Sequence, residues 1–151
     1  MESIDNSYDE LAGRLETLIA LSDGLCELLI TERQALADRD PIALQTILDA
    51  KRAKCGEIEQ MTLALGTIPL SQQIQDAPSA LRKELEHLHT SLLEQADRAQ
   101  EYNAVNGKIV RRSQQSVRDL IHLISGMDAE LLYGEQVQTM ATEQGTAIAK
   151  A

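Results

Sequence analysis

Two acid–histidine pairs are the clearest candidates for chemistry in this sequence. The first pair is Glu84 and His87, three positions apart. The second is Asp119 and His122, with the same spacing. Such pairs bind metal ions in helical bundles when they project inward. At about 100° per residue, however, Asp119 and His122 lie opposite an apolar stripe, and the first pair only flanks one. The pattern favours solvated surface residues, and we expect no metal and no cofactor.

His122 also begins the sequence HLISG, residues 122–126, which is similar to the H-x-L-K-G motif of histidine phosphotransfer domains. In those helical domains an exposed histidine accepts a phosphoryl group and a lysine pairs with it. Ser125 stands in place of that lysine. A phosphotransfer domain that uses His122 stays open as an alternative. No Walker loop, G-x-S-x-G motif or cysteine–histidine nucleophile pattern is present, so we expect no enzyme activity.

Net charge and composition limit the classes of molecule that this protein can bind. The chain of 151 residues has 14 Lys and Arg against 24 Asp and Glu, a formal net charge of −10. Most of the surface would repel a phosphate backbone, so we expect no nucleic-acid partner. No apolar run approaches the roughly 18 residues that span a bilayer, and the N-terminus MESIDNSYDE does not resemble a signal peptide. We expect a cytoplasmic protein without a membrane span.

The apolar residues are nearly all aliphatic. Aromatic residues make up 2% of the chain, with no Phe and no Trp, so the core must consist of Leu, Ile, Ala and Met. This composition is typical of helical proteins. Cys26 and Cys55 form no CxxC pair, and we expect both to be reduced and to pack as small hydrophobic residues.

Apolar spacings of three and four residues predict three long helices. Asp40 is a good N-cap, and Pro41 a good first residue, for the second helix. Gly66 is a natural end for it. The second helix carries its predicted apolar stripe at Leu44, Leu48, Cys55, Ile58 and Leu65. The predicted helices span about residues 4–38, 41–65 and 79–125.

Short connections between neighbouring helices imply antiparallel packing. We therefore expect an all-α fold, an elongated antiparallel bundle of three to four long helices in residues 1–133, with a flexible tail at 134–151. A third helix of about 47 residues would be about 70 Å long, far longer than the second. Part of it must overhang, bend at Gly107 or meet another chain.

Near the middle of the third predicted helix, polar residues interrupt the apolar stripe. Asn103, Asn106 and Gly107 lie there, although Gly costs about 1 kcal/mol against Ala inside a helix. One interpretation is a loosely packed overhang. The other is a helix-packing motif in which Asn106 and Gly107 allow a close approach or a bend and select the partner and register.

The same region is locally basic. Glu101 is the only acidic residue from 98 to 118, whereas residues 1–32 hold eight acids and only Arg14. This surface is either a solvated helix face or a site for an acidic partner, including a second copy of the first helix. Its basic residues are Arg98, Lys108, Arg111, Arg112 and Arg118.

Several of these features together resemble the FlgN family of flagellar type III export chaperones. The first predicted helix contains the pattern LxxLLxxERxAL, which begins at Leu25. Arg39 and Asp40 then separate it from the second helix, which carries Ile42 and Leu44 near its start. The most specific likeness is the N-x-x-N-G-x-[LI] run, which is followed further on by Tyr133-Gly134. The residues of that run are Asn103, Asn106, Gly107 and Ile109.

The resemblance implies a cytoplasmic chaperone, without ATPase activity, that binds amphipathic C-terminal helices of hook-associated subunits and delivers them to the export gate. It places gate docking on Tyr133. A structural coiled-coil protein that forms a homodimer stays open as an alternative. An uncovered apolar stripe on one chain can pack against the same stripe on a second copy. The residues that the resemblance implies for binding the substrate protein are Ile109, Val117, Leu120, Ile121 and Ile124.

Overall fold

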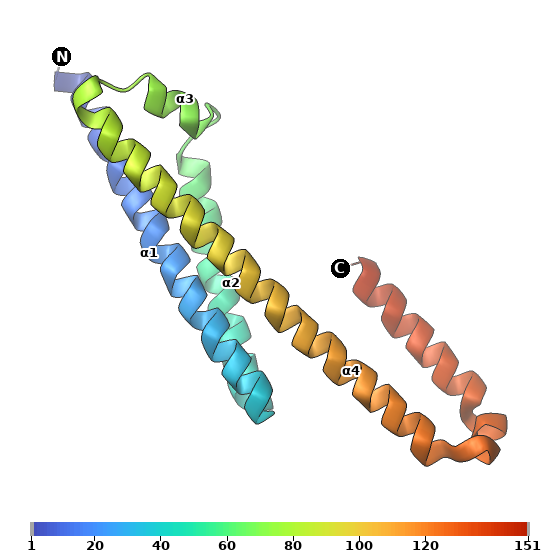
Figure 1. Cartoon of the computed structure of the whole chain (residues 1–151). Helices are drawn as coiled ribbons and strands as arrows, with labels where there is room; N and C mark the ends of the chain where they lie inside the picture. Colours follow the sequence, from blue (N-terminus) through green and yellow to red (C-terminus); the bar gives the residue numbers. More distant parts are fainter. Residues whose placement is uncertain (1, 151) are drawn as a thin grey trace. The chain divides into compact units, whose positions relative to one another are not determined.

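The computed structural model describes the backbone of residues 2–150 and the side chains of residues 6–124. Over this range the backbone forms helices and no strand, which confirms the all-α prediction (Figure 1). The chain divides into two units, unit 1 at Met1–Ile109 and unit 2 at Val110–Ala151. The helices are α1 (Glu2–Asp38), α2 (Pro41–Ala64), α3 (Leu70–Gln75) and α4 (Ser79–Lys150).

Local sequence signals set the helix boundaries in unit 1. Asp40 caps α2, since its carboxylate Oδ1 accepts a hydrogen bond of 3.0 Å from the Ala43 backbone N–H, and Pro41 is the first helical residue. Arg39 adopts a left-handed φ of 54° to make the turn before it. After α2 ends, Gly66 has a φ of 86°, a conformation that glycine adopts without a Cβ clash.

Helices α1, α2 and the first part of α4 lie side by side in unit 1, and α3 belongs to the connection between α2 and α4 (Figure 1). One core cluster joins Leu11 and Leu15 of α1 to Ile74 of α3 and Leu85 of α4. The Tyr8 hydroxyl donates a hydrogen bond of 3.1 Å to the Asp76 carbonyl oxygen. Side-chain and backbone contacts thus hold the connecting segment against α1.

The inward face of α2 differs from the predicted stripe. Leu48 and Cys55, which we expected on the inner side, are exposed, and Ile47 is buried. Residues that are at least half-buried recur every three or four positions along α2, and Ala43 and Gly56 beside them are half-buried too. The recurring residues are Leu44, Ile47, Lys51, Lys54, Ile58 and Met61.

Lysines occupy two of these positions because their aliphatic stems can cover apolar surface. The ammonium group of Lys51 reaches Glu32 and Asn103. The prediction was right for Leu44, Ile58 and Leu65, which are half-buried. It was wrong for the other two because it admitted only apolar residues to the packed face.

Helix α4 is continuous in the structure. Its backbone stays helical through Gly107, where we considered a bend, and through Gly126 to Lys150. The helix therefore runs past residue 125, where the sequence pattern placed its end. No proline follows Pro78, and a single glycine costs only about 1 kcal/mol in a helix. The flexibility of residues 134–151 stays a prediction.

A buried polar network links the three long helices of unit 1. The Asn106 side chain of α4 is 3% exposed, and its Nδ2 donates hydrogen bonds of 2.8 Å to the Leu29 carbonyl oxygen and to Glu32 Oε2. The Arg33 Nε donates to Asn106 Oδ1 at 3.1 Å. Lys51 of α2 donates to both carboxylate oxygens of Glu32 at 3.2 Å. The buried carboxylate therefore has both an ion-pair partner and an amide donor.

Two peripheral contacts complete this network. Lys51 also donates to Asn103 Oδ1 at 3.3 Å, and the Arg33 guanidinium lies 5.4 Å from the centre of the Tyr102 ring. That distance is within the range of a cation–π interaction. The two asparagines of the sequence motif thus have different roles: Asn106 is buried at the centre, and Asn103 is exposed at the edge.

Replacing the central amide should weaken unit 1. We expect Asn106→Ala to lower the free energy of unfolding by about 2 kcal/mol, because Glu32 loses a donor and the Leu29 carbonyl loses its side-chain partner. Asn103→Ala is the matched control and should cost less than about 0.5 kcal/mol, since its single contact is exposed. Urea unfolding followed by circular dichroism measures both values. Equal losses in the two variants would contradict a central role for Asn106.

Candidate partner-binding surface

Unit 2 carries a group of exposed aliphatic side chains on one side of α4. Every described side chain from Arg111 to Ile124 is exposed. At about 100° per residue, the aliphatic residues from Val110 to Ile124 fall within an arc of roughly 160° around the helix axis. Leu123 and Ile124 are the most exposed, at 80% and 77%. We call this surface the α4 apolar face; it consists of Val110, Val117, Leu120, Leu123 and Ile124.

The exposed apolar residues of unit 1 are arranged differently. They occur singly along several elements, and isolated exposed aliphatic residues are ordinary on protein surfaces. Only in unit 2, among the described residues, do five of them gather along one side of a single helix segment. Those of unit 1 are Ile30, Ile42, Leu48, Leu63, Ile68 and Leu93.

The predicted substrate-binding residues divide between the two units. Ile109 is half-buried and is the last residue of unit 1. The other four lie exposed on α4 in unit 2. Three of them belong to the α4 apolar face, and Ile121 lies about 20° beyond its Val110 edge. The side chain of Tyr133, the predicted gate-docking residue, lies outside the described residues. The four exposed predicted residues are Val117, Leu120, Ile121 and Ile124.

Sequence reasoning omitted Val110 and Leu123 from this surface. Val110 directly follows the predicted Ile109, and Leu123 directly precedes the predicted Ile124. A count at 3.6 residues per turn would have found Val110, because it lies seven positions before Val117. Leu123 lies three positions after Leu120, and residues with this spacing are neighbours on a helix surface. The signal was therefore present in the spacing.

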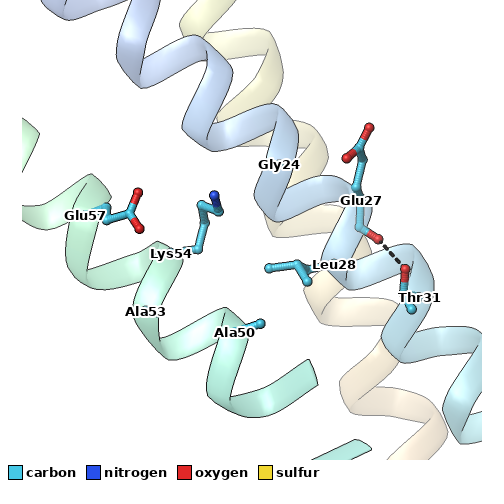
Figure 2. Close-up of a pocket in the computed structure, with 8 residues that line it drawn as sticks. All are labelled: Gly24, Glu27, Leu28, Thr31, Ala50, Ala53, Lys54 and Glu57. Carbon is cyan, nitrogen blue, oxygen red and sulfur yellow. Dashed lines mark hydrogen bonds between the residues drawn. The ribbon is translucent and has the colours of Figure 1, made fainter. Parts of the chain in front are cut away.

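A shallow groove of about 500 Å³ lies between α1 and α2 (Figure 2). Sequence reasoning did not find it, although small residues mark it, since Gly24, Ala50 and Ala53 leave the space. The Lys54 side chain lies over Gly24, where an added Cβ would be 3.5 Å from Lys54 Cε. In its lining, the Thr31 hydroxyl donates a hydrogen bond of 2.9 Å to the Glu27 carbonyl oxygen. The full lining is Gly24, Glu27, Leu28, Thr31, Ala50, Ala53, Lys54 and Glu57.

The residues considered for chemistry at the outset lie on the surface. Glu84, His87, Asp119 and His122 are exposed, and Asp119 accepts a hydrogen bond of 2.9 Å from Gln115. Among the described side chains no group of three or more His, Cys, Asp and Glu residues could hold a metal ion. An exposed His122 suits the phosphotransfer alternative, but the position of the missing lysine lies outside the described side chains. Within the described residues, no helix is long and apolar enough to cross a membrane.

The two cysteines are both free but lie in contrasting surroundings. Cys26 is buried on α1, with its Sγ 3.8 Å from the Gln95 carbonyl oxygen. Burial raises the pKa of the Cys26 thiol; the positive charge of Arg98 acts in the opposite direction, and Asp23 adds to the rise. Cys55 is exposed, which corrects our expectation that it packs as a hydrophobic residue. Only the Cys55 thiol is open to reagents.

Alkylation should distinguish the two thiols. Near neutral pH we expect iodoacetamide to label Cys55 at least about tenfold faster than Cys26, because a raised pKa lowers the thiolate fraction and burial blocks access. The Cys55→Ser variant should retain only the slow thiol, and Cys26→Ser only the fast one. Mass spectrometry of timed samples gives the rates, and denaturant should make them equal. Equal rates in the folded protein would contradict the burial of Cys26.

Comparison with known proteins supports the resemblance found in the sequence. A family model described as FlgN protein matches residues 1–140, which is most of the chain. No curated protein and no solved structure matched it. A match of this extent covers all of α1, α2 and α3 and the α4 apolar face. The chain therefore belongs to the FlgN family, the family of flagellar export chaperones.

Proposed function

We propose that this protein is the cytoplasmic chaperone of hook-associated flagellar subunits and binds their amphipathic helices on the α4 apolar face. In this role it prevents premature assembly of the subunits and delivers them to the cytoplasmic domain of the export gate. It acts by binding alone, without catalysis and without a cofactor. The observation that carries the proposal is the exposed aliphatic face of α4 in a chain of the FlgN family.

The chemistry of this face suits the recognition of helices. An amphipathic helix presents apolar side chains every three or four residues, and a second helix with a matching stripe can cover them. The α4 apolar face has such a stripe, built from Val, Leu and Ile without an aromatic ring. Aliphatic side chains adapt to different partners, which a chaperone of more than one subunit requires. Covering both surfaces removes apolar area from water and so stabilises the complex.

Acidic substitutions on this face should abolish substrate binding. We expect Leu120→Asp plus Ile124→Asp to weaken binding to purified hook-associated subunits at least about 100-fold, since burying each aliphatic side chain contributes about 1.5–3 kcal/mol. Helicity should be unchanged because both side chains are exposed. Isothermal titration calorimetry measures the affinity, and circular dichroism the fold.

The matched control is Ile42→Asp plus Leu63→Asp on α2. These residues are as exposed as those of the α4 apolar face, at 80% and 74%, but belong to unit 1. The control protein should bind the subunits with wild-type affinity. Undiminished binding by the α4 variant, or equal losses in both variants, would remove the α4 apolar face from the substrate site.

The gate interaction is separable from substrate binding in this proposal. We expect Tyr133→Ala to keep the affinity for hook-associated subunits but to lose at least about tenfold in affinity for the cytoplasmic domain of the gate, as truncation of an aromatic anchor does at protein interfaces. Tyr133→Phe, which retains the ring, serves as the control. Surface plasmon resonance with the immobilised gate domain gives both constants. Equal gate affinity of the wild type and Tyr133→Ala would contradict this role.

Self-association is the second candidate function, and the same exposed face favours it, because an aliphatic stripe can pair with its own copy. Light scattering separates the two. A monomer at micromolar concentration agrees with a chaperone whose face is open to substrate. A stable dimer that Leu120→Asp plus Ile124→Asp dissociates would instead support a structural coiled coil.

A further inference from the structure

Asn106 and Gly107 form the one Asn-Gly pair of the sequence. Asparagine is a thermolabile residue, and in a flexible chain this pair is its most reactive setting. The backbone nitrogen of the glycine attacks the side-chain amide carbon of the asparagine, and ammonia leaves as a five-membered succinimide ring closes. Glycine favours the attack because it has no Cβ to obstruct it. Water then opens the ring to aspartate or isoaspartate, so that a carboxylate replaces the amide.

The folded backbone opposes ring closure at this position. Gly107 lies inside the continuous helix α4, where a helical ψ of about −42° keeps its nitrogen away from the side-chain amide of the preceding residue. In an α-helix the N–H of that nitrogen also donates to the carbonyl four residues earlier. The ψ angle of Asn106 must therefore leave the helical region, and this hydrogen bond must break, before the ring can form.

The side chain of Asn106 is also fixed by its contacts. It is 3% exposed, and Nδ2, the nitrogen that would leave, donates to the Leu29 carbonyl oxygen and to Glu32 Oε2 at 2.8 Å. Its Oδ1 accepts a hydrogen bond of 3.1 Å from Arg33 Nε. All three partners lie on α1. The attack therefore requires α4 to separate from α1 at this point.

We propose that Asn106–Gly107 is a latent deamidation site that the packing of unit 1 keeps closed, so that only chains whose α4 has separated from α1 convert it, irreversibly. Both products lack the amide donor that the Leu29 carbonyl oxygen and Glu32 share. Isoaspartate, the larger fraction, also inserts a methylene group into the main chain of α4. The reaction thus couples opening of unit 1 to permanent loss of its native packing. The site belongs to unit 1, whereas the α4 apolar face belongs to unit 2.

Other positions in the chain provide internal comparisons. Asn6 and Asn103 are exposed, but each precedes a residue whose Cβ slows the attack. Asp23 is exposed and precedes Gly24, and an aspartate in this setting also forms isoaspartate, but without a change in mass. Peptide mapping by mass spectrometry resolves these positions, because only conversion of an asparagine adds the mass difference between an amide and an acid.

Incubation of the full-length protein in native buffer and in guanidinium chloride tests the proposal. Asn106 should deamidate at least about 100-fold more slowly in native buffer, since the rate follows the small population of open molecules. Gly107→Ala should slow the reaction in denaturant at least about tenfold, because the added Cβ obstructs the attack. After return to native buffer, the deamidated fraction, separated by ion exchange, should unfold at a lower denaturant concentration than the unmodified fraction.

Core variants test the role of packing without denaturant. Leu15→Ala leaves the Asn-Gly pair untouched but truncates a side chain of unit 1 that is 0% exposed. It should raise the deamidation rate of Asn106 in native buffer at least about tenfold, because the fraction of open molecules rises as stability falls. Leu15→Val, a smaller truncation, should raise the rate less. Ile42→Ala, at a position that is 80% exposed, is the matched control and should deamidate at the wild-type rate.

Three results would overturn the proposal. One is an equal rate at Asn106 in native buffer and in denaturant, or in both Leu15 variants and the wild type. Another is faster conversion of Asn103 than of Asn106 in denaturant, because the glycine would then not be the labile element. The third is a deamidated fraction that unfolds at the same denaturant concentration as the unmodified protein, because native packing would then survive the reaction.

Discussion

A buried carboxylate needs a partner, and the partners of Glu32 determine how the helices of unit 1 meet. Lys51 from α2 and Asn106 from α4 both reach this one group on α1. A shift of either helix by one turn, about 5.4 Å, would leave the carboxylate without that partner. Leucine-rich surfaces tolerate several registers, whereas this network permits one. Polar residues thus specify the packing that the aliphatic core stabilises.

The same aliphatic composition has different consequences in the two units. In unit 1, Leu11, Leu15 and Leu85 are buried together with α3. In unit 2, Leu120 and Ile124 are of the same kind but exposed to solvent. Because the hydrophobic effect is non-directional, it drives burial against whichever surface is available.

Much of the fold followed from local signals. Asp40, Pro41 and Gly66 act within a few residues of their own positions, so the boundaries of α2 could be read from the sequence. The packed face of α2 could not. Lys51 and Lys54 have the composition of surface residues and become half-buried only because α1 lies beside them. Apolar periodicity also did not predict the C-terminal end of α4. The backbone stays helical beyond the last residues of the apolar pattern, because a helix does not require a continuous apolar stripe.

The sequence by itself determined the helical class, the turn before α2 and the aliphatic stripe of α4, because each depends on residues that are close along the chain. Only the tertiary structure decided that Glu32 meets Lys51, 19 positions away, and Asn106, 74 positions away. It also decided that Cys26 is buried and Cys55 is not. Periodicity identifies a face of a helix, but the neighbour that covers this face comes from distant residues whose register depends on the whole packed unit.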